Sequence, residues 1–219
     1  MTPYMHDNIE YVRSQNKDWN VHIFTGIEMD SFILEHFDST MLALYRSINP
    51  LYGAARADFF RYLAVYALGG VYLDCKSSCD RPLDQAILHN GAVDIILWNR
   101  GHQYSELSCD KSPNRHDEFC QWVIISPKHS PILQRVISDV MFNLKHTNGT
   151  GWDVLKITGP LQYTASVCSC LSAFRWTMRR EHESGFRYCR NEREYKLQNE
   201  TGPRRKKHYS QLEEPIIIW

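Results

Sequence analysis

The sequence has no excess of charge of either sign. Its 219 residues include 25 lysine and arginine residues and 25 aspartate and glutamate residues, so the formal net charge at pH 7 is zero. A balanced chain creates no overall field that would attract nucleic acid or an anionic membrane surface, and basic residues do not alternate with aromatic ones as in a nucleic-acid reader. We therefore expect no nucleic-acid partner, and an anionic ligand needs a local site.

Long apolar runs are also missing. Residues 1–10 contain no apolar core of the length that a signal peptide needs, and no later run is long enough to span a bilayer. The sequence predicts a soluble, cytoplasmic chain without a membrane span, unless an anchor has been removed.

The seven cysteines lack the paired spacing of a structural metal site. Cys75-x-x-x-Cys79 and Cys168-x-Cys170 have no matching second half. Because scattered cysteines in an odd number are typical of a reducing compartment, we interpret them as buried, unpaired thiols. No P-loop, G-x-S-x-G or H-E-x-x-H sequence occurs either, so the commonest phosphate-binding, hydrolase and zinc-protease motifs are absent.

The segments that are present alternate between helical and strand patterns. Apolar spacing predicts helices over residues 8–15, 29–34, 39–47, 54–68, 131–144 and 161–174. Alternating or wholly apolar runs predict strands over residues 19–24, 71–73, 94–98 and 121–126. This alternation predicts a single α/β domain over residues 1–219, with a mostly parallel, mixed central sheet flanked by helices. The alternative is that these residues are a fragment of a longer chain.

Three polar or terminal segments complete the pattern. Residues 101–118 contain few apolar residues and are predicted to form an exposed loop or a flap over a site. Residues 175–208 are rich in charge, and their basic run 204–208 is interpreted as a solvated tail or linker. The apolar end, residues 216–219, is predicted to be a last strand or a docking segment.

Three charged residues are placed where a ligand could reach them. Asp58 and Arg61 are three residues apart on one face of an otherwise apolar helix, where each charge needs compensation. Asp74 follows strand 71–73 directly, at the carboxyl end where α/β sheets bind ligands. The pair Gly69-Gly70 allows the sharp turn that would bring helix and strand together. The alternative interpretation of Asp58 and Arg61 is an internal salt bridge that orients the helix.

The same residues resemble a known family. Arg56-Ala57-Asp58-Phe59-Phe60-Arg61-Tyr62-Leu63, followed by Leu68-Gly69-Gly70-Val71-Tyr72-Leu73-Asp74, is similar to the "R-x-D-x-x-R-Y" and "G-G-x-Y-x-D-x-D" motifs of the DXD sugar-binding glycosyltransferases. This group includes fungal initiating mannosyltransferases and bacterial capsular polysaccharide transferases (glycosyltransferase family 32-like). The later segments 122–133 and 158–160 also fit the family, so the resemblance covers roughly residues 4–165.

The resemblance implies a GT-A fold and transfer of a sugar from a nucleotide-sugar, such as a UDP-hexose or UDP-deoxyhexose, to a glycan or glycoprotein with retention of configuration. The implied catalytic residues are Asp58 and Arg61, which would bind hydroxyls of the donor sugar, and Asp74, the first acid of the metal motif. A manganese or magnesium ion would assist departure of the nucleoside diphosphate. Further implied donor-binding residues are Arg56, Tyr62, Gly70, Lys76 and Gln121.

Two departures from the family pattern affect this expectation. The third position of the metal motif, normally an aspartate, is Lys76, so one oxygen ligand is missing. Either the cation is held more weakly by Asp74 with Asp80 or His208, or Lys76 itself contacts the diphosphate. The family's usual opening strand, "I-P-K-I-I-H-Q-x-W", is not found. A non-catalytic, degenerate nucleotide-sugar-binding domain is therefore the alternative function, and a nucleotide-sugar hydrolase is a third.

Overall fold

The computed structural model describes residues 1–87, 94–99, 118–147, 149–201 and 207–219. Its helices are α1 (Pro3–Gln15), α2 (Gly26–His36), α3 (Ser39–Ser47), α4 (Gly53–Leu68), α5 (Leu83–Ala86), α6 (Pro131–His146), α7 (Val154–Ile157), α8 (Pro160–Cys170), α9 (Glu181–Ser184) and α10 (Glu192–Thr201), with 3-10 turns η1 (Gly151–Asp153) and η2 (Tyr209–Gln211). Its strands are β1 (Gly70–Leu73), β2 (Ser78–Cys79), β3 (Asp94–Asn99), β4 (Glu118–Phe119), β5 (Val123–Ser126), β6 (Trp176–Arg180) and β7 (Phe186–Arg187). The predicted α/β class is confirmed.

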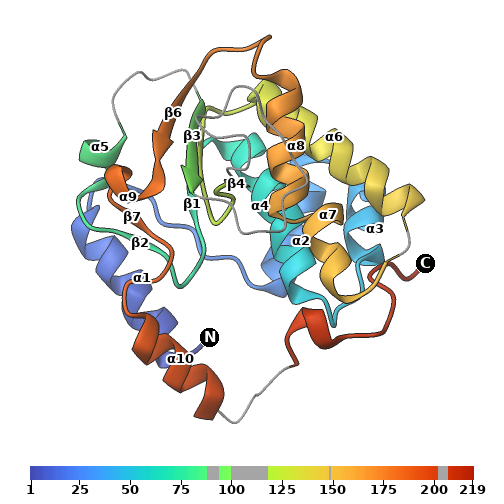
Figure 1. Cartoon of the computed structure of the whole chain (residues 1–219), viewed down its shortest axis with the longest axis horizontal. Helices are drawn as coiled ribbons and strands as arrows, with labels where there is room; N and C mark the ends of the chain where they lie inside the picture. The colour runs from blue at the N-terminus through green and yellow to red at the C-terminus, as the bar shows by residue number, and fades with distance from the viewer. Residues whose placement is uncertain (88–93, 100–117, 148, 202–206) are drawn as a thin grey trace.

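The main sheet has the strand order β1-β5-β3-β4, with β6 also paired to β3 (Figure 1). The β1–β5, β3–β5 and β3–β4 pairs are antiparallel, and only β3–β6 is parallel among the described strands. The prediction of a mostly parallel sheet is therefore wrong. Apolar runs show that both faces of a strand are covered, and this coverage gives the same sequence pattern in either direction.

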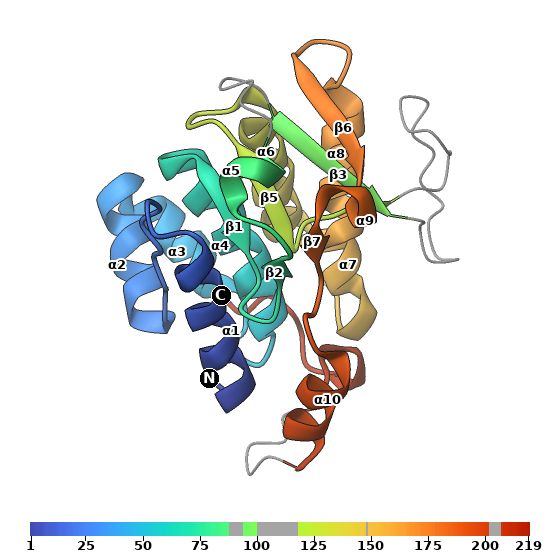
Figure 2. The same ribbon diagram turned by 90° about the vertical axis from the view of Figure 1, so that its left-hand side faces the viewer.

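The sheet separates two apolar cores, because successive side chains of a strand point to opposite faces. Ile96 and Ile124 face a large core beneath α4, α6 and α8, whereas Ile95 and Ile125 face a smaller core with α5 and β7. Figures 1 and 2 show α4, α6 and α8 on one side of the sheet and α5 and α9 on the other.

Helix α4 ends where the sequence predicted, at a pair of glycines. The φ angles of Gly69 and Gly70 are 72° and 88°, in the region that favours glycine. A Cβ atom on Gly69 would lie 2.6 Å from the backbone nitrogen of Lys128. The break therefore needs glycine for both backbone conformation and space, and it leads the chain from α4 straight into β1.

One predicted strand is absent from the structure, and one region holds elements that were not predicted. Residues 19–24 form no strand, although their side chains alternate, since no described strand pairs with them. The charge-rich region 175–208 contributes β6 to the sheet and Phe186 to the smaller core, although no element was predicted there. The predicted loop 101–118 lies almost wholly outside the described residues, as does most of the basic run 204–208.

The C-terminal segment docks on α3 and α4, as predicted. Ile217 forms an isolated antiparallel bridge with Ile48, and Ile216 is fully buried. The backbone N–H of Ile216 donates to the carbonyl of Gly149 at 2.8 Å. Ile216 and Ile217 thus complete the large core.

The prediction that all cysteines are unpaired is wrong for Cys168, which takes part in a disulfide bond. The other described cysteines carry free thiols, namely Cys75, Cys79, Cys120, Cys170 and Cys189. A disulfide depends on the distance between two residues in the fold, which spacing along the chain does not reveal. Over the described ranges, no helix combines the length and the apolar character needed to cross a membrane.

Candidate functional site

The candidate site lies where β1 ends beside the start of β5. The N–H of Asp74 donates to the carbonyl of Trp122 at 2.9 Å, which continues the β1–β5 pairing by one residue. Helix α4 packs against both strands. Side chains from the middle of α4 therefore meet the end of β1, as the sequence predicted for Asp58, Arg61 and Asp74.

Arg61 joins the two carboxylates. Its Nη2 atom lies 3.0 Å from Asp58 Oδ1 and 3.3 Å from Asp74 Oδ1. Its Nη1 atom donates to the carbonyl of Gln121 at 3.0 Å. The side chains of Asp58 and Arg61 are only 6% and 5% exposed. Because water hardly reaches them, the two charges are neutralised mainly by each other.

Asp58 is also held by neutral donors. Gln121 Nε2 donates to its Oδ1 at 3.1 Å, and Thr158 Oγ1 donates to its Oδ2 at 3.2 Å. The Tyr62 hydroxyl lies between Gln121 Oε1 and the carbonyl of Thr158 (2.9 Å), within donating distance of both. The predicted residues Tyr62 and Gln121 thus belong to the cluster. Thr158 was missed, although it begins the Thr158-Gly159-Pro160 motif.

The electrostatics of the cluster follow from its burial. Burial raises the pKa of Asp58 to about 6, an effect that Arg61 opposes and Asp74 reinforces. Burial alone would lower the pKa of Arg61, but the neighbouring Asp74, Tyr72 and Asp58 outweigh it and raise the pKa. Arg61 therefore stays cationic, while Asp58 can take up a proton under mildly acidic conditions.

Tyr72 orients Asp74 and was not predicted as a site residue. Its hydroxyl donates to Asp74 Oδ1 at 2.8 Å, and the Arg61 guanidinium carbon lies 5.0 Å from its ring centroid. Burial raises the pKa of Tyr72 well above its usual value, so the hydroxyl keeps its proton. The signal that could have found Tyr72 is its place at the tyrosine of the "G-G-x-Y-x-D-x-D" motif.

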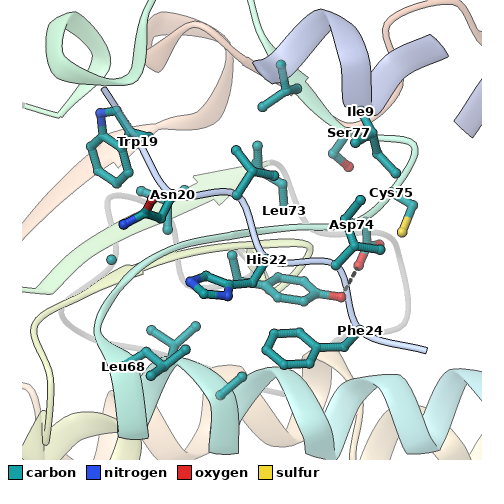
Figure 3. A pocket seen from close by; sticks show the side chains of 18 of the residues that line it. Ile9, Trp19, Asn20, His22, Phe24, Leu68, Leu73, Asp74, Cys75 and Ser77 are labelled. Carbon is teal, nitrogen blue, oxygen red and sulfur yellow. Dashed lines mark hydrogen bonds between the residues drawn. The ribbon is translucent and has the colours of Figure 1, made fainter. Parts of the chain in front are cut away.

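A cavity of about 480 Å³ adjoins Asp74. Its walls are α1, residues 19–24, α4 and β1, and its lining is mainly apolar. Figure 3 shows Asp74 at one end and Trp19 and Asn20 at the other, with His22 and Phe24 between them. The Asp74 side chain is 20% exposed, more than its partners Asp58 and Arg61. Asp74 is therefore the member of the charged cluster that a ligand in the cavity can reach.

Two other predicted donor-binding residues have separate positions. Gly70 lines the cavity through its backbone. The Arg56 Nε atom donates to the carbonyl of Ile48 at 2.9 Å, and its guanidinium lies 5.5 Å from the Tyr45 ring centroid. Arg56 thus ties α4 to α3 and does not join the charged cluster.

The predicted metal ligands are not brought together. Asp80 forms an ion pair with Arg187 at 2.6 Å, and the His208 ring accepts or donates a hydrogen bond with Ser210 Oγ at 2.7 Å. No group of three or more His, Cys, Asp or Glu side chains within the described part of the chain could hold a metal ion. Asp74 supplies a single carboxylate, and its Oδ1 already contacts Tyr72 and Arg61. The described donor set therefore does not fit a divalent cation held by the protein.

The sequence comparisons concern the same segment of the chain. Residues 2–93, which include Asp58, Arg61 and Asp74, match the family model described as "Glycosyltransferase sugar-binding region containing DXD motif". The predicted resemblance is confirmed. The matched residues include Asp74 and Lys76, the two positions that the sequence analysis compared with the acids of the DXD motif.

Several curated fungal proteins are similar to the chain. It is 30% identical to the "Initiation-specific alpha-1,6-mannosyltransferase" of Candida albicans, over 51% of this chain and 34% of that protein. The protein of the same name from Schizosaccharomyces pombe is 27% identical, over 53% of this chain and 32% of that protein. The chain therefore spans about a third of the length of the curated relatives it matches. Among solved structures, "PaToxG Glycosyltransferase" aligns with a TM-score of 0.48 and 16% identity, over 78% of this chain and 64% of that chain.

Proposed function

We propose that this chain is the donor-binding part of a GT-A glycosyltransferase, which transfers a hexose from a nucleotide-sugar to a glycan or glycoprotein. The observation that carries the proposal is the position of Asp74. It ends a strand inside the DXD region, is held by Arg61 and Tyr72, and adjoins a largely apolar cavity. The cavity volume of about 480 Å³ lies within the usual range of small-molecule sites.

Each part of this arrangement suits one part of a nucleotide-sugar. The apolar walls of the cavity suit the flat base and the ribose, whereas Asp74 can accept hydrogen bonds from ribose or sugar hydroxyls. Asp58 and Arg61 are too buried to contact much of a donor, so we assign them to positioning Asp74 and supplying a permanent positive charge near it. The names of the fungal relatives favour a hexose, and mannose is the first to test. Retention of configuration rests on the family resemblance.

The proposal is tested with Asp74→Asn, which removes the charge of Asp74 and keeps its shape. Donor binding is measured by calorimetry with uridine and guanosine diphosphate hexoses, and turnover by release of the nucleoside diphosphate. Because misplacing a bound substrate costs on the order of 10²-fold in rate, we expect a loss of about that size. The matched control is Asp80→Asn, which breaks an exposed ion pair with Arg187 and should leave turnover unchanged.

The outcomes separate the three candidate functions. Binding of a nucleotide-sugar without turnover on any acceptor or water identifies a non-catalytic binding domain. This alternative is favoured by the extent to which Asp58 and Arg61 satisfy each other. Release of free sugar without acceptor identifies a hydrolase. Full turnover by Asp74→Asn would refute the assignment of the site.

A further inference from the structure

The side chain of Lys76 is held in place by two tyrosines from the C-terminal part of the chain. Its ammonium group donates a hydrogen bond to the Tyr188 hydroxyl and lies 3.8 Å from the centroid of the Tyr188 ring. The Tyr195 ring centroid lies 5.6 Å from the same nitrogen. Hydrogen bonding and contact with two aromatic rings restrain a side chain that is otherwise flexible.

The tyrosines are themselves anchored on the site. Tyr188 packs edge-on against Trp122 at 5.5 Å between ring centroids, and its carbonyl accepts from Ser77 Oγ at 2.8 Å. The Trp122 carbonyl also accepts from the N–H of Asp74. Trp122 therefore holds both the end of β1 and the tyrosine that contacts Lys76. Burial alone would lower the pKa of Lys76, but Tyr188 and Asp74 nearby raise it, so the ammonium stays charged.

The charge of Lys76 equals the charge of the group that it replaces. In the family motif this position is an aspartate, and a divalent cation bound to that aspartate leaves a local charge of plus one. The ammonium group of lysine supplies the same local charge of plus one without a metal. An ammonium also has three N–H donors, of which Tyr188 takes one, so two remain for phosphate oxygens.

We propose that Lys76, positioned by Tyr188, takes the place of the divalent cation, so that this chain binds the diphosphate of its donor without metal. The proposal rests on the proposed function, because it assumes a nucleoside diphosphate beside Asp74. The proposal also explains why Asp74 has no group of metal-binding side chains around it in the described part of the chain. Lys76 contacts the ligand, whereas Tyr188 acts through Lys76 as a positioning residue.

The test is calorimetric binding of UDP and GDP to the whole chain, in excess EDTA and in excess manganese. The wild type should bind with a Kd that differs less than about threefold between the two buffers, since metal neither supplies nor removes a needed charge. Lys76→Asp restores the family motif, so its binding should weaken at least about tenfold in EDTA and recover in manganese. Lys76→Met should bind weakly in both buffers.

A control and a positioning variant complete the test. Lys145→Asp makes the same change of charge on the exposed last turn of α6 and should bind like the wild type. Tyr188→Phe keeps the ring and loses the hydrogen bond, so its Kd in EDTA should rise severalfold while its Kd in manganese stays equal to that in EDTA. A merely structural role for Tyr188 would instead lower thermal stability and leave the Kd unchanged.

The failures of the two proposals are distinguishable. If the folded wild type binds neither nucleotide in either buffer, the proposed function fails. If it binds only in manganese, or if Lys76→Met binds as well as the wild type in EDTA, the metal-free proposal is overturned and the donor site remains.

Discussion

Replacing Arg61 by methionine should leave two carboxylates without their buried partner. Arg61 contacts Asp58 at 3.0 Å, Asp74 at 3.3 Å and the Gln121 carbonyl at 3.0 Å, with only 5% of its side chain exposed. Removing one partner of a buried ion pair typically costs about 3–5 kcal/mol, because the remaining charge has no water to stabilise it. A loss of this size is a large share of the usual 5–15 kcal/mol of domain stability.

Urea denaturation measures this loss. With a typical slope of about 2–3 kcal/mol per molar urea, the midpoint of Arg61→Met should fall by about 1–2.5 M. The loss should be smaller at pH 5 than at pH 7.5. Asp58 already has a pKa raised to about 6, and this pKa rises further without Arg61. At pH 5 the carboxyl is therefore neutral, and its burial costs less free energy.

Two further variants decide whether the uncompensated charge is the cause. Arg61→Met combined with Asp58→Asn should be more stable than Arg61→Met alone, because the second change removes one of the unpaired charges. Arg46→Met breaks an ion pair near the surface, in which Arg46 Nη2 lies 2.8 Å from Asp30 Oδ2. This variant should lose less than about 1 kcal/mol of stability. Equal losses for Arg61→Met and Arg46→Met would refute the reasoning.

Two other predictions concern Asp58 alone and the glycine break. Relative to Asp58→Asn, the unfolding free energy of the wild type should fall by roughly 2–3 kcal/mol as the pH rises from about 4 to about 6. The raised pKa of Asp58 means that the fold favours the protonated form and loses this stabilisation when the carboxyl ionises. Urea midpoints across this range check the prediction, and parallel curves for the two proteins would contradict it. Gly69→Ala should destabilise the fold by at least about 2 kcal/mol, because the new Cβ meets the Lys128 nitrogen and the φ angle is 72°. Gly53→Ala, whose Cβ meets nothing within 4 Å, is the control for thermal denaturation, and equal melting temperatures would contradict the steric argument.

The parts of the fold that the sequence predicts are those determined by neighbours along the chain. The helical apolar spacing of α4, the two glycines after it and the apolar run of β1 are all local signals, and the structure places them as expected. The meeting of Asp58, Arg61 and Asp74 follows from these same signals, because only a glycine turn separates the helix from the strand. The α/β class and the charged cluster could therefore be predicted.

The remaining features depend on contacts between distant segments. The partner of Lys76, Tyr188, is 112 residues away, and Thr158 is 100 residues from Asp58. The parallel partner of β3 comes from the charge-rich region 175–208, where no strand was predicted. The role of Tyr72 depends on which face of β1 points to Arg61. None of these pairings leaves a periodicity in the sequence.

The contacts of residues 214–217 impose an order on folding, because the large core cannot close before these residues are made. Asn49 donates through its side chain to the carbonyl of Pro215, 166 residues later, and Tyr52 donates to the carbonyl of Glu214 at 2.6 Å. At about 5–20 residues per second, the ribosome needs roughly 10–30 s to make this intervening chain. Throughout that time the apolar surface around Ile48 lacks its cover and is open to chaperones or to other nascent chains. The large core therefore closes only after Ile216 and Ile217 have been made, although many of its residues come from α2, α3 and α4.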